Sequence, residues 1–316
     1  MRALNFGRRA LGVSAAAVMI SSCSGPQPPG AMGPPSQQSP TLLGAAATDL
    51  LYVSHQRSVD MIAYPAGAIF GTLRFHAAVS GLCSNPSGDV FISVRRNITD
   101  GRIYEYAHGA TTPTTIIVSR SGAPFACAFD ATTGNLAVAM TVGSGPGHVA
   151  VYPKITGKQI DYEDPVLYGY NYCAFDGDGN LFVDAYSNVL GELAKGRRKF
   201  SNYKLRLKPN SHLATMQWDG KYLAVEELPT GSNRAVLDRV AIVYSGFGRK
   251  AEIAGKTRLN GDAVLFASLN GAVAIGIEGS DHREIGLWHY PAGGTAFKTL
   301  EGDERSFYGV AFSTAK

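Results

Sequence analysis

A short motif recurs six times along this 316-residue chain and limits what the chain can fold into. Each copy is a segment of alternating apolar and polar residues that ends in an aromatic residue or leucine, usually followed by Pro, Ala, Ser or Gly. The final residues of the copies are Tyr64, Tyr106, Tyr152, Leu193, Tyr244 and Tyr290. A second motif recurs with the same spacing. It consists of an apolar segment, a tight Asp/Asn–Gly turn and another apolar segment, as at 172–183. Alternation with a period of two is typical of strands rather than helices.

The repeat has the length of one blade of a β-propeller. Its copies begin about 45 residues apart, and four strands fit in that length. The segment from Asp49 lacks a first strand before 51–54, whereas 307–312 has the pattern of a first strand. Joining the two completes one blade and removes two exposed sheet edges. The sequence therefore predicts an all-β fold over residues 48–316: a six-bladed β-propeller of four-stranded blades, closed by pairing of the N- and C-terminal strands in one blade.

The turns at 130–136 and 176–181 carry a resemblance to a known group of propellers. Their Asp-x-x-Gly-Asn-Leu pattern resembles NHL-repeat and related six-bladed propellers, a broad group that includes the gluconolactonase-like hydrolases. The resemblance implies the fold. It also implies a channel that, in the hydrolases, holds a divalent cation with Glu, Asn and Asp.

Polar residues precede the inner strands at five places, and they are our candidates for a polar channel mouth, with ordinary solvated loop residues as the alternative. They are His76, Asn171, His212, Asp262 and Arg305. Only one of the five is a carboxylate, so the metal ligands of the hydrolases cannot be matched one by one to residues of this chain. We expect no metal, no cofactor and no catalytic residue, and the sequence contains no nucleophile elbow or zinc-binding His-Glu-x-x-His motif.

The first 47 residues predict export and anchoring rather than folded structure. Residues 1–22 combine three arginines with the apolar segment 10–20, which is too short to span a bilayer and is typical of a signal peptide. The tetrapeptide ending at Cys23 resembles the bacterial lipobox, which implies acylation of Cys23 with lipid, palmitate included. Residues 23–47, rich in Pro, Gly and Ser, are expected to form a flexible tether. The predicted location is the cell membrane or outer membrane, facing the periplasm or exterior.

Removing that signal peptide also removes three positive charges. The formal net charge then falls from +4 to +1, which gives no indication of a nucleic-acid partner. We expect a monomer that contacts the membrane through the lipid on Cys23 and binds an unknown protein or small molecule.

Three cysteines recur in successive repeats, at Cys83, Cys127 and Cys173. Equivalent side chains should point the same way within each blade, which disfavours a bridge between them. We expect small buried apolar side chains, with a disulfide or a metal site as the alternatives.

Two further motifs have structural explanations. Residues 176–180 resemble the start of a calcium loop, but the sister copy at Asp130 favours a hairpin turn. The basic run 195–208 suggests contact with an anionic lipid or acidic partner, or a solvated edge strand protected by lysine.

These observations favour a membrane-anchored, non-enzymatic binding or interaction propeller of the bacterial envelope. Two alternatives stay open: a metal-dependent, lactonase-like hydrolase or lyase that uses the central channel, and a structural envelope protein.

Overall fold

In the computed structural model the chain consists of two compact units, residues 1–39 and 40–316. The described residues begin at residue 48, within the second unit. The description covers 48–316 with breaks at 144, 185–187, 230–233, 246–247, 263–265, 270–271, 277–283 and 302–307. Cys23 and the predicted signal and tether segments lie outside these residues. The described part contains strands, turns and bends only. None of its elements is a helix of the length and apolarity needed to cross a membrane.

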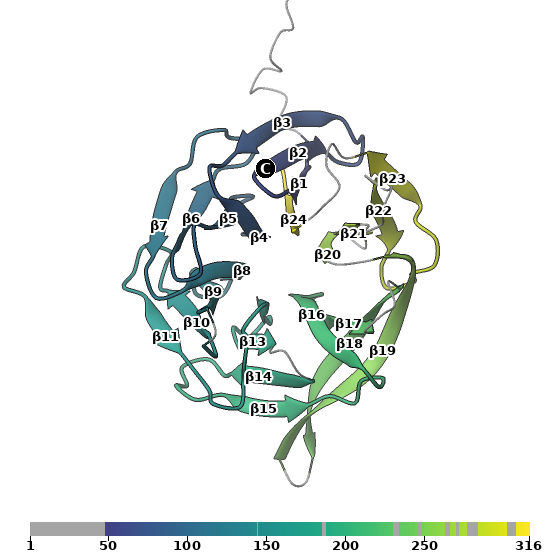
Figure 1. Ribbon diagram of the computed structural model, residues 1–316. Coiled ribbons are helices and arrows are strands. Elements are labelled where there is room, and N and C mark those ends of the chain that lie inside the picture. The colour runs from purple at the N-terminus through teal and green to yellow at the C-terminus, as the bar shows by residue number, and fades with distance from the viewer. Residues whose placement is uncertain are drawn as a thin grey trace, which may run out of the picture. The chain divides into compact units, whose positions relative to one another are not determined.

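The described strands form six four-stranded antiparallel sheets, arranged as blades around a centre (Figure 1). The first three sheets contain β24 (Gly309–Ser313), β1 (Leu50–Ser54), β2 (Ser58–Ala63) and β3 (Ile69–Arg74); β4 (Ala78–Ser84), β5 (Val90–Arg95), β6 (Gly101–Tyr106) and β7 (Thr115–Ser119); and β8 (Ala123–Asp130), β9 (Asn135–Thr141), β10 (His148–Tyr152) and β11 (Ile160–Tyr162). The other three contain β12 (Cys173–Phe175), β13 (Leu181–Asp184), β14 (Val189–Leu193) and β15 (Ser201–Lys204); β16 (Ser211–Trp218), β17 (Leu223–Pro229), β18 (Arg234–Ser245) and β19 (Gly248–Asp262); and β20 (Phe266–Leu269), β21 (Ala272–Gly276), β22 (Glu284–His289) and β23 (Lys298–Glu301).

Strands from opposite ends of the described chain share one blade. β24 pairs with β1 in an antiparallel register that runs from Leu50↔Ser313 to Ser54↔Gly309. The backbone N–H of Ala315 also donates to the Asp49 carboxylate at 2.8 Å. The predicted propeller of four-stranded blades, closed by its first and last strands, is therefore confirmed.

The core lies between neighbouring blades rather than inside any one of them. Successive residues of a strand face opposite sides of its sheet, and here both sides are covered by another blade. One cluster joins Ala137 and Val149 of the β8–β11 blade to Leu181 and Leu193 of the β12–β15 blade. Because both faces are covered, strands such as β1 and β10 are buried along their whole length.

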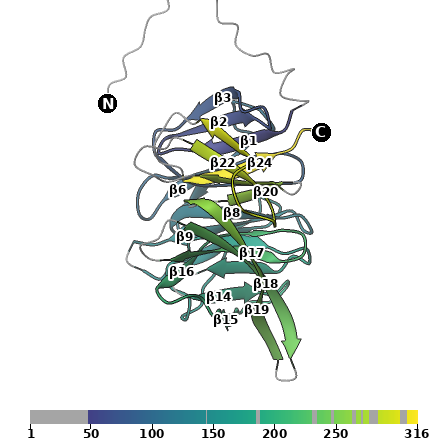
Figure 2. The same cartoon turned by 90° about the vertical axis from the view of Figure 1, so that its right-hand side faces the viewer.

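The blade formed by β16–β19 departs from the predicted repeat, in which the fourth strand is short. β18 has 12 residues and β19 has 15, and their hairpin projects outward beyond the ring (Figures 1 and 2). Arg249 on this hairpin forms a 2.7 Å ion pair with the buried carboxylate of Glu192 in β14. The extension therefore fastens one blade to its neighbour.

Candidate functional site

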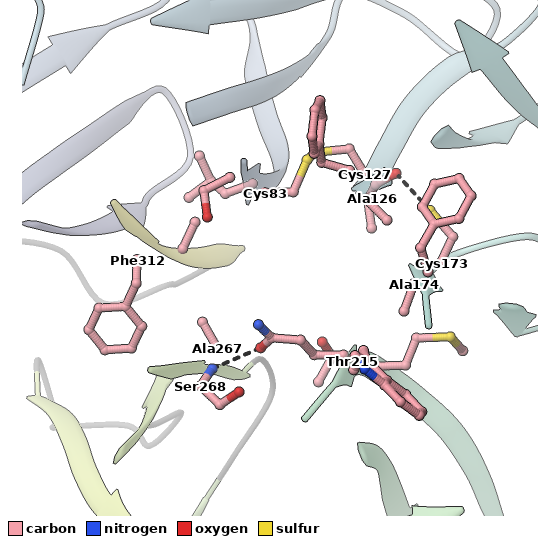
Figure 3. A pocket seen from close by; sticks show the side chains of 18 of the residues that line it. Cys83, Ala126, Cys127, Cys173, Ala174, Thr215, Ala267, Ser268 and Phe312 are labelled. Atoms are coloured by element: carbon pink, nitrogen blue, oxygen red, sulfur yellow. Dashed lines mark hydrogen bonds between the residues drawn. A yellow bond between two sulfur atoms is a disulfide. The ribbon is translucent and has the colours of Figure 1, made fainter. Parts of the chain in front are cut away.

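The innermost strands of the blades surround a cavity of about 410 Å³ at the centre of the ring. β4, β8, β12, β16, β20 and β24 each contribute residues to its wall. Because six strands converge there, much of the wall consists of small side chains, including those of Ala126, Ala174, Thr215 and Ala267 (Figure 3). Ala311 of β24 adds another. Asp176 is the only charged side chain among the described lining residues.

Aromatic side chains recur at one position of the repeat and line the cavity. Phe129, Phe175, Trp218 and Phe312 each lie opposite a leucine of the second strand, near the C-terminal end of the inner strand. All four line the cavity. The channel wall thus combines apolar rings with uncharged hydrogen-bonding groups, a lining typical of small-molecule sites.

Asp176 belongs to a hairpin turn, as predicted for residues 176–180, and not to a calcium loop. Its Oδ1 accepts hydrogen bonds from the backbone N–H groups of Asp178 and Asn180, at 3.0 and 2.8 Å. Its Oδ2 accepts from the side-chain amide of Asn180 at 2.8 Å. Gly179 adopts φ +83°, as such a turn requires. The carboxylate oxygens are therefore already used within the turn.

Cys83 and Cys127 form a disulfide between β4 and β8, with their Cα atoms 5.6 Å apart (Figure 3). The prediction of unbridged, equivalent cysteines is wrong for this pair. Cys127 and Cys173 lie three residues before the turn residues Asp130 and Asp176, whereas Cys83 lies only two before Asn85, its counterpart.

A shift of one residue turns a strand side chain to the opposite face. The side chain of Cys83 in the β4–β7 blade therefore faces the β8–β11 blade, and the side chain of Cys127 in that blade faces Cys83. The position in the β8–β11 blade that corresponds to Cys83 is Ala128, so Cys173 faces an alanine and keeps a free thiol. Burial raises the pKa of that thiol to about 12.

Three of the five predicted mouth residues do not line this cavity. His76 is exposed before β4, His212 is partly buried in β16, and Asn171 is buried before β12; none of the three lines the cavity. The side chain of Asp262 and all of Arg305 lie outside the described residues. The backbone of Asn171 links two blades, because its carbonyl accepts a hydrogen bond from the N–H of Ala126 at 3.3 Å.

The basic run follows the predicted alternation. Lys204 and Arg206 are exposed, whereas Tyr203 and Leu205 are buried. Tyr203 donates its hydroxyl proton to Glu192 at 2.6 Å, so the buried face fixes the strand and the cations face solvent.

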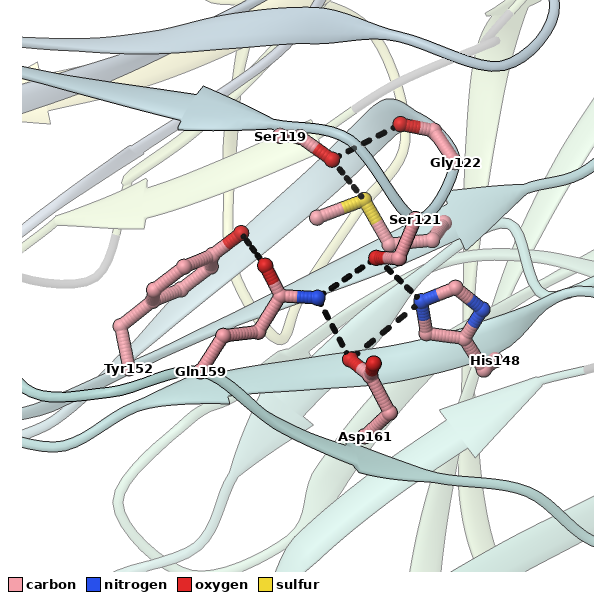
Figure 4. Close-up of polar contacts among 8 residues, drawn as sticks. Ser119, Ser121, Gly122, His148, Tyr152, Gln159 and Asp161 are labelled. Atoms are coloured by element: carbon pink, nitrogen blue, oxygen red, sulfur yellow. Dashed lines mark hydrogen bonds and ion pairs between the residues drawn. The ribbon is translucent and has the colours of Figure 1, made fainter.

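Ser121, His148 and Asp161 lie together in the β8–β11 blade, yet their geometry differs from that of a catalytic triad (Figure 4). Nε2 of His148 lies 3.0 Å from Ser121 Oγ and 3.4 Å from Asp161 Oδ1. In a triad the acid binds the other ring nitrogen, so that the imidazole can relay a proton. Gln159 also bridges Ser121 and Asp161, with bonds of 2.5 and 2.7 Å. The group is a structural hydrogen-bond cluster, and burial lowers the pKa of His148.

Among the described residues, no group of three or more His, Cys, Asp or Glu side chains is placed to hold a metal ion.

Comparisons with known proteins identify the fold. No family model matches the chain. No curated protein matches it. A chain in the crystal structure of a nidogen/laminin complex is similar over 85% of this chain and 99% of its own length, with a TM-score of 0.65 and 12% identity. A protein of unknown function from Bacteroides caccae is similar over 84% of this chain and 99% of its own length, with a TM-score of 0.56 and 11% identity. The Cps50 (Swd1) β-propeller domain of Myceliophteria thermophila is similar over 81% of this chain and 84% of its own length, with a TM-score of 0.53 and 12% identity. At these identities the likeness shows the β-propeller fold alone.

Proposed function

We propose that this protein is a lipid-anchored, non-enzymatic binding propeller of the bacterial envelope. In this proposal, residues 1–22 direct export, Cys23 carries the lipid and residues 23–47 tether the propeller of 48–316 to the membrane. The propeller resembles the NHL-repeat group, and the aromatic-lined end of its channel receives the ligand.

The channel cavity carries this proposal. Its volume of about 410 Å³ lies within the usual range of ligand sites, about 300–1,000 Å³. Its wall presents aromatic rings and neutral polar groups, and the carboxylate of Asp176 is occupied by its own turn. Such a wall suits recognition by shape, stacking and hydrogen bonding.

The chain offers a direct optical test of binding. Trp218 lines the cavity, whereas Trp288, the only other tryptophan, is 1% exposed in the core. In a Trp288→Phe variant, Trp218 alone reports binding by its fluorescence. We expect ligand candidates from envelope extracts to shift that emission, and a Phe175→Ala change in the cavity wall to weaken the shift. A ligand that binds the purified full chain without altering Trp218 emission would place the binding site elsewhere.

The anchor has its own test. We expect the wild-type chain to fractionate with membranes and to carry diacylglycerol and palmitate on Cys23 by mass spectrometry. A Cys23→Ala variant should become soluble in the same fractionation. A variant that still fractionates wholly with membranes would contradict lipid anchoring.

A further inference from the structure

A second hollow opens beside the channel, between the β16–β19 and β20–β23 blades, with a volume of about 500 Å³. We name it the cationic groove and define it by Trp218, Asp219, Lys221, Tyr222, Arg239 and Tyr290. Gln217, Trp218, Ser268 and Leu269 line both the groove and the channel cavity. The two hollows are therefore adjacent, with Trp218 at their junction.

The single carboxylate of the groove is fully engaged by the protein. Oδ1 of Asp219 accepts hydrogen bonds from the backbone N–H groups of Lys221 and Tyr222, at 2.8 and 2.6 Å. Oδ2 accepts from the hydroxyl of Tyr290 at 2.5 Å. Asp219 holds the hairpin turn and fastens it to the next blade, and its one negative charge against Lys221 and Arg239 leaves the groove with a net charge of +1.

The two cations of the groove make no direct ion pair with a described residue. Nζ of Lys221 lies 5.1 Å from the centre of the Tyr222 ring, and the guanidinium carbon of Arg239 lies 5.8 Å from it. In the described part of the chain, neither cation has a carboxylate within 4.0 Å. Nε of Arg239 is moreover buried and donates no hydrogen bond to a described residue, which costs stability unless another group accepts one from it.

Neutral donors extend the same pattern toward the channel. Oε1 of Gln217 accepts from the backbone N–H of Ser268 at 2.8 Å, which leaves the amide NH₂ as the free end of this side chain. The indole N–H of Trp218 has no partner among the described residues either. The groove thus holds an excess of donors over acceptors, the arrangement that suits an anionic oxygen group.

We propose that the cationic groove binds the carboxylate or phosphate group of a small organic anion, whose hydroxyl-bearing ring lies beside Trp218 at the channel mouth. The inference rests on the proposed function, because it makes the channel end a ligand site. Arg239 supplies a planar fork that fits either anionic group, and Lys221 adds a mobile charge. The ring is assigned to the junction because Gln217, Ser268 and the Trp218 ring offer it an amphipathic surface.

The test titrates the purified full-length Trp288→Phe chain with glucuronate, glucose 6-phosphate, inorganic phosphate and glucose, and follows Trp218 emission. We expect glucuronate or glucose 6-phosphate to bind at least tenfold more tightly than glucose, and to weaken as salt rises. The stronger of these two probes identifies the anionic group as carboxylate or phosphate. Inorganic phosphate should bind more weakly than glucose 6-phosphate, because it has no ring to contact Trp218.

Matched variants distinguish the groove from general charge. Lys221→Gln with Arg239→Gln should weaken binding of the charged sugar at least tenfold. Lys195→Gln with Arg197→Gln removes the same charge from exposed positions of the neighbouring blade and should leave affinity unchanged. Lys221 is exposed, so Lys221→Gln alone gives a folded check and should cost severalfold in affinity.

Equal binding of glucose and the charged probes, no binding of any probe, or equal losses in the two double variants would overturn the anion site. A ligand from envelope extracts that shifts Trp218 emission, while none of the charged probes binds, would also overturn it. That last result would leave the proposed binding function standing.

Discussion

The hydroxyl of Ser54 donates a 3.2 Å hydrogen bond to the backbone carbonyl of Gly309, although 255 residues separate the two in the chain. This bond lies at one end of the β1–β24 register and joins the first described strand to the last. β24 is also held by the next blade, because Ser313 donates its hydroxyl proton to the carbonyl of Gly88. One short strand therefore completes a blade and links it to its neighbour.

Deletion of residues 309–316 should open the ring. The deletion leaves the inner edge of β1 without a partner and exposes apolar side chains such as Val53 and Leu51. We expect loss of a cooperative calorimetric transition and formation of oligomers in size-exclusion chromatography. Removal of Lys316 alone, an exposed residue, is the control and should change neither property. A truncated monomer with an unchanged Tm would show that ring closure does not depend on β24.

The facing relationship between Cys83 and Cys127 predicts where a second bridge can form. Ala128→Cys places a thiol at the position that corresponds to Cys83, opposite the free Cys173. We expect an oxidised variant with a bridge between position 128 and Cys173, and a gain of about 3 kcal/mol in unfolding free energy from the closed loop. Peptide mapping under non-reducing conditions detects the bridge, and denaturation with and without reductant measures the gain.

Ala150→Cys is the matched control for this experiment. Ala150 is also buried in the same blade, but it packs against Phe91 and Ile103, on the opposite face from Cys173. No bridge to Cys173 should form there. Bridging from both positions, or from neither, would contradict the assigned side-chain directions.

Residue spacing in the sequence was enough to predict the ring, its four-stranded blades and its closure, because each follows from a period that recurs along the chain. The same spacing misled on the cysteines, since Cys83 and Cys127 are 44 residues apart, close to one repeat. Counting from the turn residues Asn85 and Asp130 instead would have revealed the one-residue shift. Strand parity, rather than the repeat length, decides which neighbouring blade a side chain meets.

The cationic groove was beyond sequence analysis for a different reason. Lys221 belongs to a turn and Arg239 to a buried strand, and no short motif links them. Their proximity depends on the fold of one blade and on Tyr290 from the next, which engages Asp219. The predicted mouth residues stand at or before the starts of the inner strands in the sequence, whereas the described cavity is bounded by residues next to the inner hairpins, such as Pro86 and Gly177.

The ion pair between Arg249 and Glu192 should contribute to the attachment of the long hairpin. Glu192 is fully buried, so Arg249→Met would leave an unpaired buried charge that costs about 3 kcal/mol of stability in urea denaturation. Lys250→Met provides an adjacent control. Lys250 pairs with Glu252, but both side chains are about half exposed, so the change should cost under about 1 kcal/mol. Equal losses would show that the buried pair has no special role.

A buried acid in the same blade predicts an unusual dependence of stability on pH. Glu226 is fully buried, neither carboxylate oxygen has a hydrogen-bond partner among the described residues, and burial raises its pKa to about 8. Below pH 4.5 the carboxyl is protonated in both the folded and unfolded states. Between pH 4.5 and 8 the unfolded chain releases this proton while the folded chain keeps it. The group therefore lowers the free energy of unfolding as pH rises, by about 1.4 kcal/mol per pH unit.

Glu226→Met keeps the approximate shape of the side chain and removes the titrating group. We expect a small gain in stability at pH 5 and a gain of a few kcal/mol at pH 8.5, measured by urea denaturation at both pH values. The neighbouring Glu227 is the control, because it pairs with Lys256 at 2.8 Å and accepts the backbone N–H of Lys208 at 2.6 Å. Burial raises the pKa of Glu227, but these bonds outweigh it and hold that pKa below the usual value. Glu227→Met should therefore destabilise the protein at both pH values. A Glu226→Met gain that is the same at pH 5 and pH 8.5 would mean that Glu226 does not retain its proton in the folded protein.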